Sequence, residues 1–336
     1  MPRNDLPVES ARSDPYGRDA TDPFLIPARG WRQVCERVIF KNSRDNFSVV
    51  AAGCAFFALF AVFPALSALI SLYALTASPA HIEKNFEGLA LVLPPEAYDV
   101  FITQIARLAE APGQTLGWSL LLSLIIAFWS ANSGAQAMLT ALNMAYAEVE
   151  RRSLIEYYAN AFAFTLAGIF GGLVVLLAII NAPIFFAFAG VSSAYESVVG
   201  IVRWPLLAVL ILVLLAFLYR FGPCRQNAKW RWVSVGSLFA TVVWLAASFA
   251  FSFYVSHFGH YVKTYGSLGA VIVLLFWLYL SFYIVLVGAE INAELELQTA
   301  KDTTTGAPKP LGRRGAFVAD HVAGGPRNSV VTRKDG

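Results

Sequence analysis

Six long blocks of apolar residues constrain this chain more than any other feature of its sequence. A helix needs about 20 consecutive, mostly apolar residues to cross the hydrocarbon core of a bilayer. Blocks of about that length lie near residues 49–75, 116–139, 159–188, 205–221, 233–254 and 268–289. The sequence therefore predicts an all-α membrane protein with about six transmembrane helices.

The composition supports this class. The 336 residues are 57% hydrophobic and 14% charged, whereas a soluble domain typically has about 25% charged residues. The net charge is only +3, and the basic residues form short clusters beside the apolar blocks. A nucleic-acid binder would show a basic face instead, so we expect the lipid bilayer as partner and no nucleic acid.

The basic clusters also predict an orientation. Lys and Arg accumulate in the cytoplasmic loops of membrane proteins. Clusters lie before the first block, between the second and third, between the fourth and fifth, and after the sixth; examples are Arg37 and Lys41, Arg151 and Arg152, Arg225 and Lys229, and Arg313 and Arg314. The alternate loops have few basic residues. Both termini are therefore expected in the cytoplasm.

Polar segments flank the membrane domain, which we place at residues 29–297. Residues 1–28 are rich in Pro, Asp and Arg, contain no apolar core of a cleaved signal, and predict a disordered tail. Residues 298–336 lack apolar periodicity and predict a second one. Within "WRQVCERVIF", Trp31, Val34 and Val38 share one helical face, which predicts a short helix that lies along the membrane or packs on the bundle. A second such helix is predicted in "PEAYDVFITQIARL", residues 95–108.

A polar stripe interrupts the second block. Asn132, Gln136, Thr140 and Asn143 are spaced i, i+4, i+8 and i+11, so they lie on one helical face. A buried amide without a partner costs several kcal/mol in hydrocarbon. The stripe must therefore face protein or water. It lines a polar substrate path, or it forms hydrogen bonds between helices.

The sixth block ends in "VGAEINAELELQ", which places Glu290 and Asn292 at the membrane boundary. An ionisable group at membrane depth is a functional candidate by default. Two interpretations stay open for Glu290. It takes part in coupling or gating, or it forms an ion pair with a basic residue of the inner side, such as Arg151, Arg220 or Arg44.

Two further features concern helix shape. Pro64 lies inside the first block and cannot donate a backbone hydrogen bond, so it predicts a kink that is either a hinge or a fixed bend. Gly168 and Gly172 form a GxxxG pattern, which predicts a close contact between helices.

Catalytic motifs are missing from the sequence, which contains no GxSxG, HExxH, P-loop or GxGxxG pattern. His257 and His260 are three residues apart, but a zinc site needs three or four ligands and no third is apparent. The three cysteines form no CxxC pair. We therefore expect no catalytic, cofactor or metal site, and a protein that is not an enzyme.

Four stretches occur in the order seen in a known family: "AAGCAFFALFAVFPALSALI" at 51–70, "LTALNMAYAEVERRS" at 139–153, "LYRFGP" at 218–223 and "YGSLGAVIVLLFWLYLSFYIVLVGAEINAELE" at 265–296. With them the chain resembles the YihY/BrkB family of bacterial inner-membrane proteins, formerly called ribonuclease BN-like, over about residues 30–297. The chain departs from the family at Phe56 and Phe57, where tyrosine is frequent, and at Ala61, where serine is.

The resemblance implies a six-helix protein of the bacterial inner (plasma) membrane without a settled activity. Family members are discussed as transporters and as factors in envelope integrity. Two hypotheses follow for this chain. It transports or translocates a substrate, a lipid or another small amphiphile, or it is a non-catalytic scaffold for envelope assembly; either could act as a homo-oligomer. A ribonuclease is not expected, because the residues for such chemistry are missing.

Overall fold

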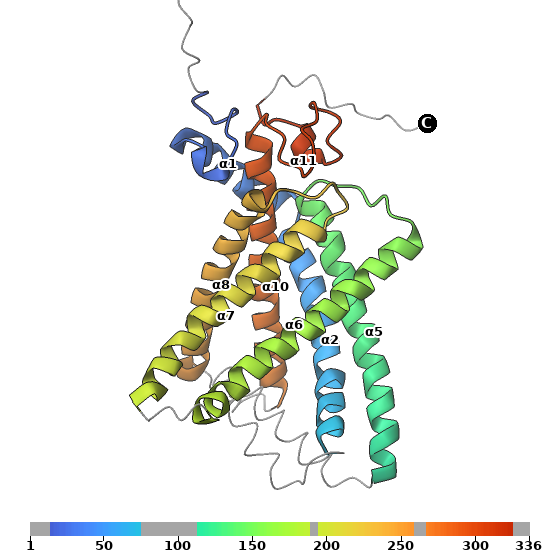
Figure 1. The fold of residues 1–336 in the computed structure, drawn as a ribbon. Helices are drawn as coiled ribbons and strands as arrows, with labels where there is room; N and C mark the ends of the chain where they lie inside the picture. The colour runs from blue at the N-terminus through green and yellow to red at the C-terminus, as the bar shows by residue number, and fades with distance from the viewer. Residues whose placement is uncertain (1–13, 75–112, 189–193, 259–266, 325–336) are drawn as a thin grey trace, which may run out of the picture.

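The computed structural model describes residues 14–74, 113–188, 194–258 and 267–324, and these residues form an all-α fold (Figure 1). The expected fold class is confirmed. The elements are η1 (Pro23–Leu25), α1 (Ala28–Arg44), α2 (Phe47–Ala74), α5 (Gly113–Ala145), α6 (Leu154–Phe188), α7 (Ala194–Phe221), α8 (Trp230–Phe258), α10 (Ser267–Gln298) and α11 (Phe317–Asp320). The described residues contain one isolated antiparallel bridge, between Ala228 and Thr304.

Six of these helices correspond to the six apolar blocks. Within the described residues, three segments are long and apolar enough to cross a membrane by themselves: Leu121–Ala145, Trp230–Val255 and Val271–Gln298. A fourth is added if α1 and the first part of α2 count as one bent span. The number of six spans stays a prediction.

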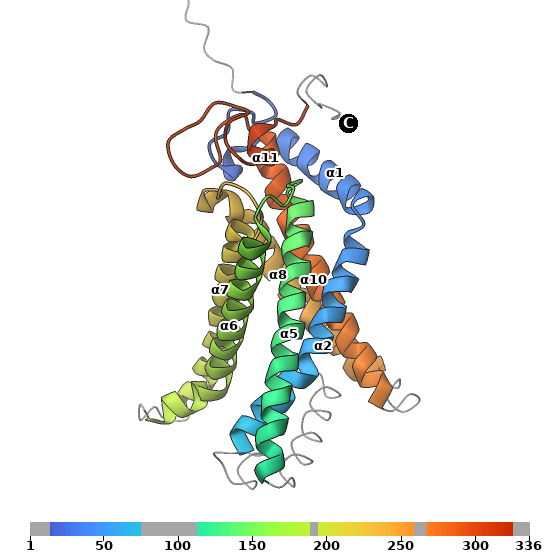
Figure 2. The same ribbon diagram turned by 90° about the vertical axis from the view of Figure 1, so that its right-hand side faces the viewer.

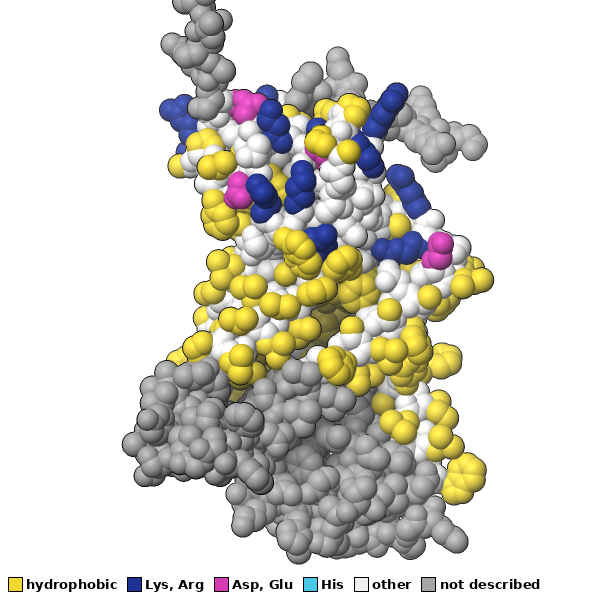
Figure 3. Space-filling view, viewed as in Figure 1, with side chains coloured by type: hydrophobic (Ala, Val, Ile, Leu, Met, Phe, Trp, Pro, Cys, Tyr) yellow, Lys and Arg dark blue, Asp and Glu magenta, His cyan; other side chains and the backbone are white. Residues whose placement is uncertain are grey.

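The helices meet at one end of the molecule, where α1, α11 and the ends of α5, α7, α8 and α10 lie together (Figure 1). We call this the charged end, because the Lys and Arg side chains of the visible face gather there, above a band of hydrophobic side chains (Figure 3). Such a band is what a bilayer covers.

A sharp turn separates α1 from α2. The two helices meet at 64°, and Asn46 between them has a φ of 51°, a left-handed conformation that asparagine tolerates better than most residues. Helix α1 then lies across the bundle on α10 (Figure 2). Its Val34 and Val38 are buried, so the apolar face predicted for this helix packs on the protein.

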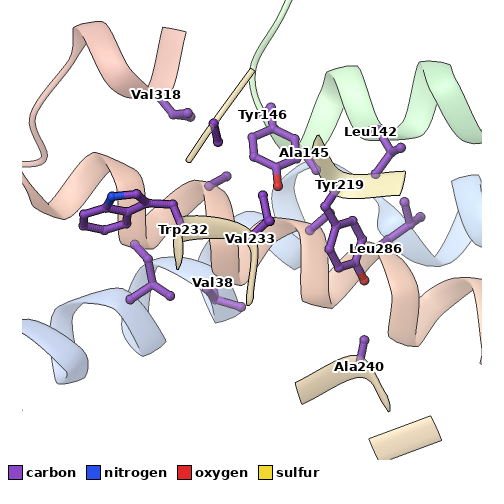
Figure 4. Close-up of a cluster of buried hydrophobic side chains, with 14 of the residues drawn as sticks. Val38, Leu142, Ala145, Tyr146, Tyr219, Trp232, Val233, Ala240, Leu286 and Val318 are labelled. Atoms are coloured by element: carbon purple, nitrogen blue, oxygen red, sulfur yellow. The ribbon is translucent and has the colours of Figure 1, made fainter. Parts of the chain in front are cut away.

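The best-packed part of the core lies at the charged end (Figure 4). Tyr146, Tyr219, Trp232 and Leu286 bring together α7, α8, α10 and the end of α5, and all four are buried. The Tyr219 hydroxyl donates a hydrogen bond to the Val285 carbonyl oxygen at 2.7 Å, so this buried tyrosine has a partner, as burial requires.

Two glycines allow α8 and α10 to cross closely. A Cβ atom at Gly236 would lie 2.1 Å from the Gly288 carbonyl oxygen, and one at Gly288 would lie 2.8 Å from the Gly236 carbonyl oxygen. Neither position has room for a side chain. At the predicted GxxxG pattern, a Cβ at Gly168 would meet no atom within 4 Å, whereas a Cβ at the neighbouring Gly171 would lie 3.2 Å from the Leu214 side chain of α7.

The prediction of two disordered tails is wrong for residues 14–26 and for residues 299–324, which we call the C-terminal segment. The Ala300 N–H donates to the Arg18 carbonyl oxygen at 2.7 Å, and the Lys229 N–H donates to the Thr303 carbonyl oxygen at 2.8 Å. The segment thus joins the start of the chain to the loop between α7 and α8.

Arg314 holds the C-terminal segment in shape. Its guanidinium is buried and donates to the carbonyl oxygens of Ala300 at 2.8 Å and Ala319 at 2.6 Å. Such polar contacts, together with partners distant in sequence, keep the segment ordered. Contacts of this kind produce no periodic pattern of apolar residues, so the sequence alone predicts disorder there.

Candidate functional site

The polar stripe of α5 divides into two parts in the structure. The part nearer the charged end is used within the protein. The Asn143 side chain is buried; its Nδ2 donates to Glu150 Oε2 at 2.8 Å, and its Oδ1 accepts from the Cys224 N–H at 2.7 Å. Asn143 therefore ties the end of α5 to residues 146–153, which we call the α5–α6 elbow, and to the loop before α8.

The α5–α6 elbow shows the electrostatic effect of these bonds. Burial alone would raise the pKa of Glu150, but hydrogen bonds from the Cys224 thiol, the Arg152 N–H and the Asn143 amide hold that pKa below its usual value. Burial raises the pKa of Glu148, although the Phe317 N–H opposes the rise.

Thr140 is also engaged. Its hydroxyl lies 3.0 Å from the Gln136 carbonyl oxygen and 3.2 Å from the hydroxyl of Tyr157, a residue of α6. The Tyr157 hydroxyl in turn donates to the Gln136 carbonyl oxygen at 3.2 Å. The stripe therefore faces α6, and Tyr157 lies over it.

Asn132 and the Gln136 side chain form the other part, which we call the polar step. Both are half-buried. Asn132 Oδ1 is enclosed without a hydrogen-bond partner in the described part of the chain. Farther along the same two helices, the rings of Phe128 and Phe162 lie 5.1 Å apart. Along α5 the polar step lies between two contacts with α6, and its Asn132 Oδ1 keeps an acceptor that the side chains near the charged end have used.

Glu290 lies in an ion-pair cluster between α10 and α1. Lys41 Nζ is 3.0 Å from Glu290 Oε1 and 2.7 Å from Glu294 Oε1. Arg37 pairs with Glu294 and donates to Gln298 Oε1 at 2.8 Å. Both carboxylate side chains are 0% exposed, so the charges that Lys41 and Arg37 supply are what permits their burial.

The predicted partners of Glu290 were wrong. The Arg151 N–H lies 3.4 Å from Cys224 Sγ, Arg44 pairs with Asp45 at 2.8 Å, and Arg220 lies over the ring of Trp230. The cation is Lys41. Arg37 and Lys41 are spaced i, i+4, as are Glu290, Glu294 and Gln298. This matched spacing is the sequence signal that could have predicted the pairing of the two helices.

Asn292 lies on another face of α10 and has a structural role. Its Oδ1 accepts from the Gly236 N–H at 2.7 Å, and its Nδ2 donates to the Val233 carbonyl oxygen at 3.2 Å. Asn292 thus fastens α10 to α8 beside the close glycine crossing.

Sequence reasoning missed a second buried ion pair. Arg225 Nη2 lies 2.6 Å from Glu296 Oε1, with both side chains 0% exposed, and the guanidinium lies 4.3 Å from the centre of the Tyr146 ring. Glu296 Oε2 also accepts from the Thr303 hydroxyl at 2.6 Å. Burial would lower the pKa of Arg225, but the charge of Glu296 keeps it above the usual value.

The remaining candidates have fewer contacts. Helix α2 continues through Pro64 without interruption, and a kink there stays a prediction. His260 lies outside the described residues, and His257 is in the last turn of α8, beyond the side chains that are described. Within the described residues, no group of three or more His, Cys, Asp or Glu side chains could hold a metal ion.

Comparison with known proteins places these features in a family. Residues 38–311, from Val38 of α1 to Leu311 of the C-terminal segment, match the family described as Virulence factor BrkB. The chain belongs to the BrkB family. The expected resemblance is thereby confirmed, and the matched range includes Lys41, the polar stripe and Glu290.

Individual relatives of this BrkB-family protein are ribonuclease-like or membrane proteins by name. The chain is 38% identical over 187 residues to the putative ribonuclease-like protein YfkH of Bacillus subtilis, covering 53% of this chain and 66% of the relative. It is 36% identical to a UPF0761 membrane protein of Tolumonas auensis, over 23% of this chain and 26% of the relative. It is 35% identical to another of Idiomarina loihiensis, over 31% and 37%. The chain thus spans less than two thirds of each of these relatives. No solved structure matches the chain.

Proposed function

We propose that this membrane protein of the BrkB family is a transporter or translocator of an amphiphilic substrate such as a lipid, and that it contributes to envelope integrity. The observation that carries the proposal is the polar step. Asn132 Oδ1 lacks a hydrogen-bond partner among the described residues, one turn from the half-buried Gln136, and such an acceptor suits the polar group of a passing substrate.

The proposal includes an orientation. We place the protein in the bacterial inner membrane with the charged end and both termini in the cytoplasm. The support is the positive-inside rule, together with the concentration of Lys and Arg at one end of the molecule (Figure 3).

Glu290 is the gating residue of this proposal. Its partner Lys41 belongs to α1, which joins α2 through the turn at Asn46. A movement of α1 about this turn would separate Lys41 from Glu290 and expose the carboxylate to water. In the same scheme Asn292 and Arg151 hold the surrounding elements in place and do not contact the substrate.

Thiol labelling tests the path. Asn132→Cys and Gln136→Cys, each in a Cys35→Ser/Cys224→Ser background, should react with a membrane-impermeant maleimide in intact cells or inverted vesicles. Val149→Cys, at an exposed position, is the positive control, and Thr165→Cys, buried in α6, is the negative control. Protection of both test positions in both preparations would contradict a water-accessible path.

Transport itself is tested with purified full-length protein in liposomes. Movement of a fluorescent phospholipid between leaflets should depend on the protein and fall severalfold in a Gln136→Leu variant. Protein-free liposomes give the baseline, and equal rates in all three preparations would refute lipid translocation.

A second candidate, a non-catalytic scaffold for envelope assembly, is favoured by Asn143 and Thr140, because their side chains already bond within the protein. In a scaffold, as a monomer or homo-oligomer, cysteines at the polar step would be protected and liposomes would show no lipid movement. Neither candidate is an enzyme. The name of YfkH describes that protein as ribonuclease-like, and no ribonuclease activity is proposed for this chain.

A further inference from the structure

Arg220 is half-buried near the charged end and has no carboxylate partner among the described residues. It lies in the last turn of α7, and no Asp or Glu of the described residues is within 4.0 Å of it. Its Nε and Nη1 atoms are enclosed and have no hydrogen-bond acceptor in the described part of the chain. By contrast, Arg37 and Arg225 pair with Glu294 and Glu296. An anion bound at this position would supply the acceptors that Nε and Nη1 lack.

Aromatic rings surround this guanidinium. Its central carbon lies 4.1 Å from the centre of the Trp230 ring and 5.3 Å from that of Phe221, and the Phe217 ring packs on Trp230 at 5.2 Å. The three aromatic residues are 47% (Phe217), 38% (Phe221) and 46% (Trp230) exposed. Stacking on a ring attracts the charge but accepts none of the N–H groups. An exposed Trp at the end of an apolar helix, as Trp230 is at the start of α8, is typical of the membrane interface.

The site continues into an apolar strip along α7. Val213, Phe217 and Phe221 are exposed and follow one another at i, i+4 and i+8, so they line one face of the helix. An acyl chain could lie along this strip while its headgroup reaches Arg220. Figure 3 shows the same arrangement on the visible face of the molecule, where hydrophobic side chains lie directly below Lys and Arg side chains.

We propose that Arg220, together with Trp230, Phe217 and Phe221, binds the headgroup phosphate of one anionic phospholipid. A guanidinium matches the geometry of a phosphate better than an ammonium group does. The site should prefer a net negative headgroup, because no carboxylate of the described residues lies nearby to hold the ammonium of a zwitterionic lipid.

This site lies at the end of α7 and is separate from the polar step of α5. It requires only that the protein lies in a membrane. The proposal therefore stands or falls independently of transport, and its test measures binding to the full-length protein in neutral detergent.

Native mass spectrometry gives the first test. Phosphatidylglycerol and phosphatidylcholine with identical acyl chains are titrated separately, and the first phosphatidylglycerol should bind about tenfold more tightly, as a charge-assisted hydrogen bond implies. Arg220→Ala should remove this preference. Arg313→Ala, which removes the same charge from an exposed side chain of the C-terminal segment, should keep it. An unchanged preference in Arg220→Ala would overturn the proposal.

Tryptophan quenching gives a second test that needs no change at Arg220. Brominated phosphatidylglycerol should quench wild-type fluorescence more than brominated phosphatidylcholine does, and the difference should disappear in Trp230→Phe. Equal quenching by the two lipids would refute the site. Glycerol phosphate is the soluble competitor; if it displaces the lipid at equal concentration, the site binds a free phosphate and the lipid assignment is wrong.

Discussion

At the residue scale, the buried charges of this protein are stable because they come in matched sets. Lys41 lies between Glu290 and Glu294, and Arg37 supplies the second positive charge. The attraction within such a cluster adds little net stability, because burying the charges is costly. Removing one member is strongly destabilising, because it leaves an unpaired buried charge.

Lys41→Met should therefore destabilise the protein by about 3–5 kcal/mol, seen as a lower unfolding temperature in detergent. The double variant Lys41→Met/Glu290→Gln should recover most of the loss, because it leaves Glu294 paired with Arg37. Arg32→Met is the matched control. Arg32 and Glu36 form an ion pair on the same helix, but both are well exposed, so its loss should change stability by less than about 1 kcal/mol. A Lys41→Met protein as stable as Arg32→Met would show that the cluster is not structural.

Asp302 makes the C-terminal segment sensitive to acid. Burial alone would raise the pKa of Asp302, but hydrogen bonds from the Lys309 N–H and from Thr304 hold the pKa below its usual value. The folded state thus binds its proton less readily than the unfolded state, and the stabilisation is present above the unfolded pKa and lost as the pH falls through the folded pKa. Pepsin should cut the segment much faster at pH 2 than at pH 4. In Asp302→Asn the difference should shrink, after correction for the enzyme's own pH dependence; an unchanged ratio would exclude Asp302 as the group responsible.

At the scale of elements, the crossing of α8 and α10 depends on the absence of two side chains. A methyl group at Gly236 would lie 2.1 Å from a backbone oxygen, and a backbone cannot move aside as a flexible side chain can. Gly236→Ala should lower stability by about 1–3 kcal/mol or more, as overpacking does. Gly53→Ala, in α2 with open space around it, should have no such effect and serves as control. Thermal unfolding of both variants checks this, and equal unfolding temperatures would mean that the helices can separate at no cost.

The sequence predicted the helices well and their contacts poorly. A single apolar block of about 20 residues satisfies its own backbone hydrogen bonds in lipid as a helix, and the described part of each block lies in a helix. Which faces meet depends on how two distant helices are aligned, and no local pattern records that. A Cβ at Gly168 would therefore meet open space although this glycine belongs to a GxxxG pattern, while Gly236 and Gly288 meet without one. The stripe of α5 was correctly predicted as one face, but its division between Asn143 and Asn132 depends on Tyr157 and Cys224 from other elements.

At the scale of the whole molecule, the C-terminal segment joins three parts of the charged end. It contacts Arg18 near the start of the chain, the loop before α8 through Thr303, and the α5–α6 elbow, where the Phe317 N–H donates to Glu148 at 2.6 Å. The sequence predicted disorder there because composition and periodicity report only local order.

Truncation after Gln298 should loosen the charged end and leave the membrane helices in place. The N–H groups of Gln226 and Lys229 would lose their acceptors on Gly315 and Thr303, so their hydrogen exchange should become at least about tenfold faster, while exchange in the middle of α8 and α10 stays unchanged. Truncation after Gly324 keeps all these acceptors and is the control. If exchange at Gln226 and Lys229 does not change in the shorter protein, the segment does not stabilise the loop.

The same contacts set an order for biogenesis. Residues 14–26 and α1 leave the ribosome before α10 and the C-terminal segment, which contribute many of the groups that hold them. Lys41 and Arg37 must therefore wait, hydrated, until Glu290 and Glu294 have been synthesised about 250 residues later. Proteins usually fold from the N-terminus during synthesis, but here the packing of α1 can only be completed once α10 has been made.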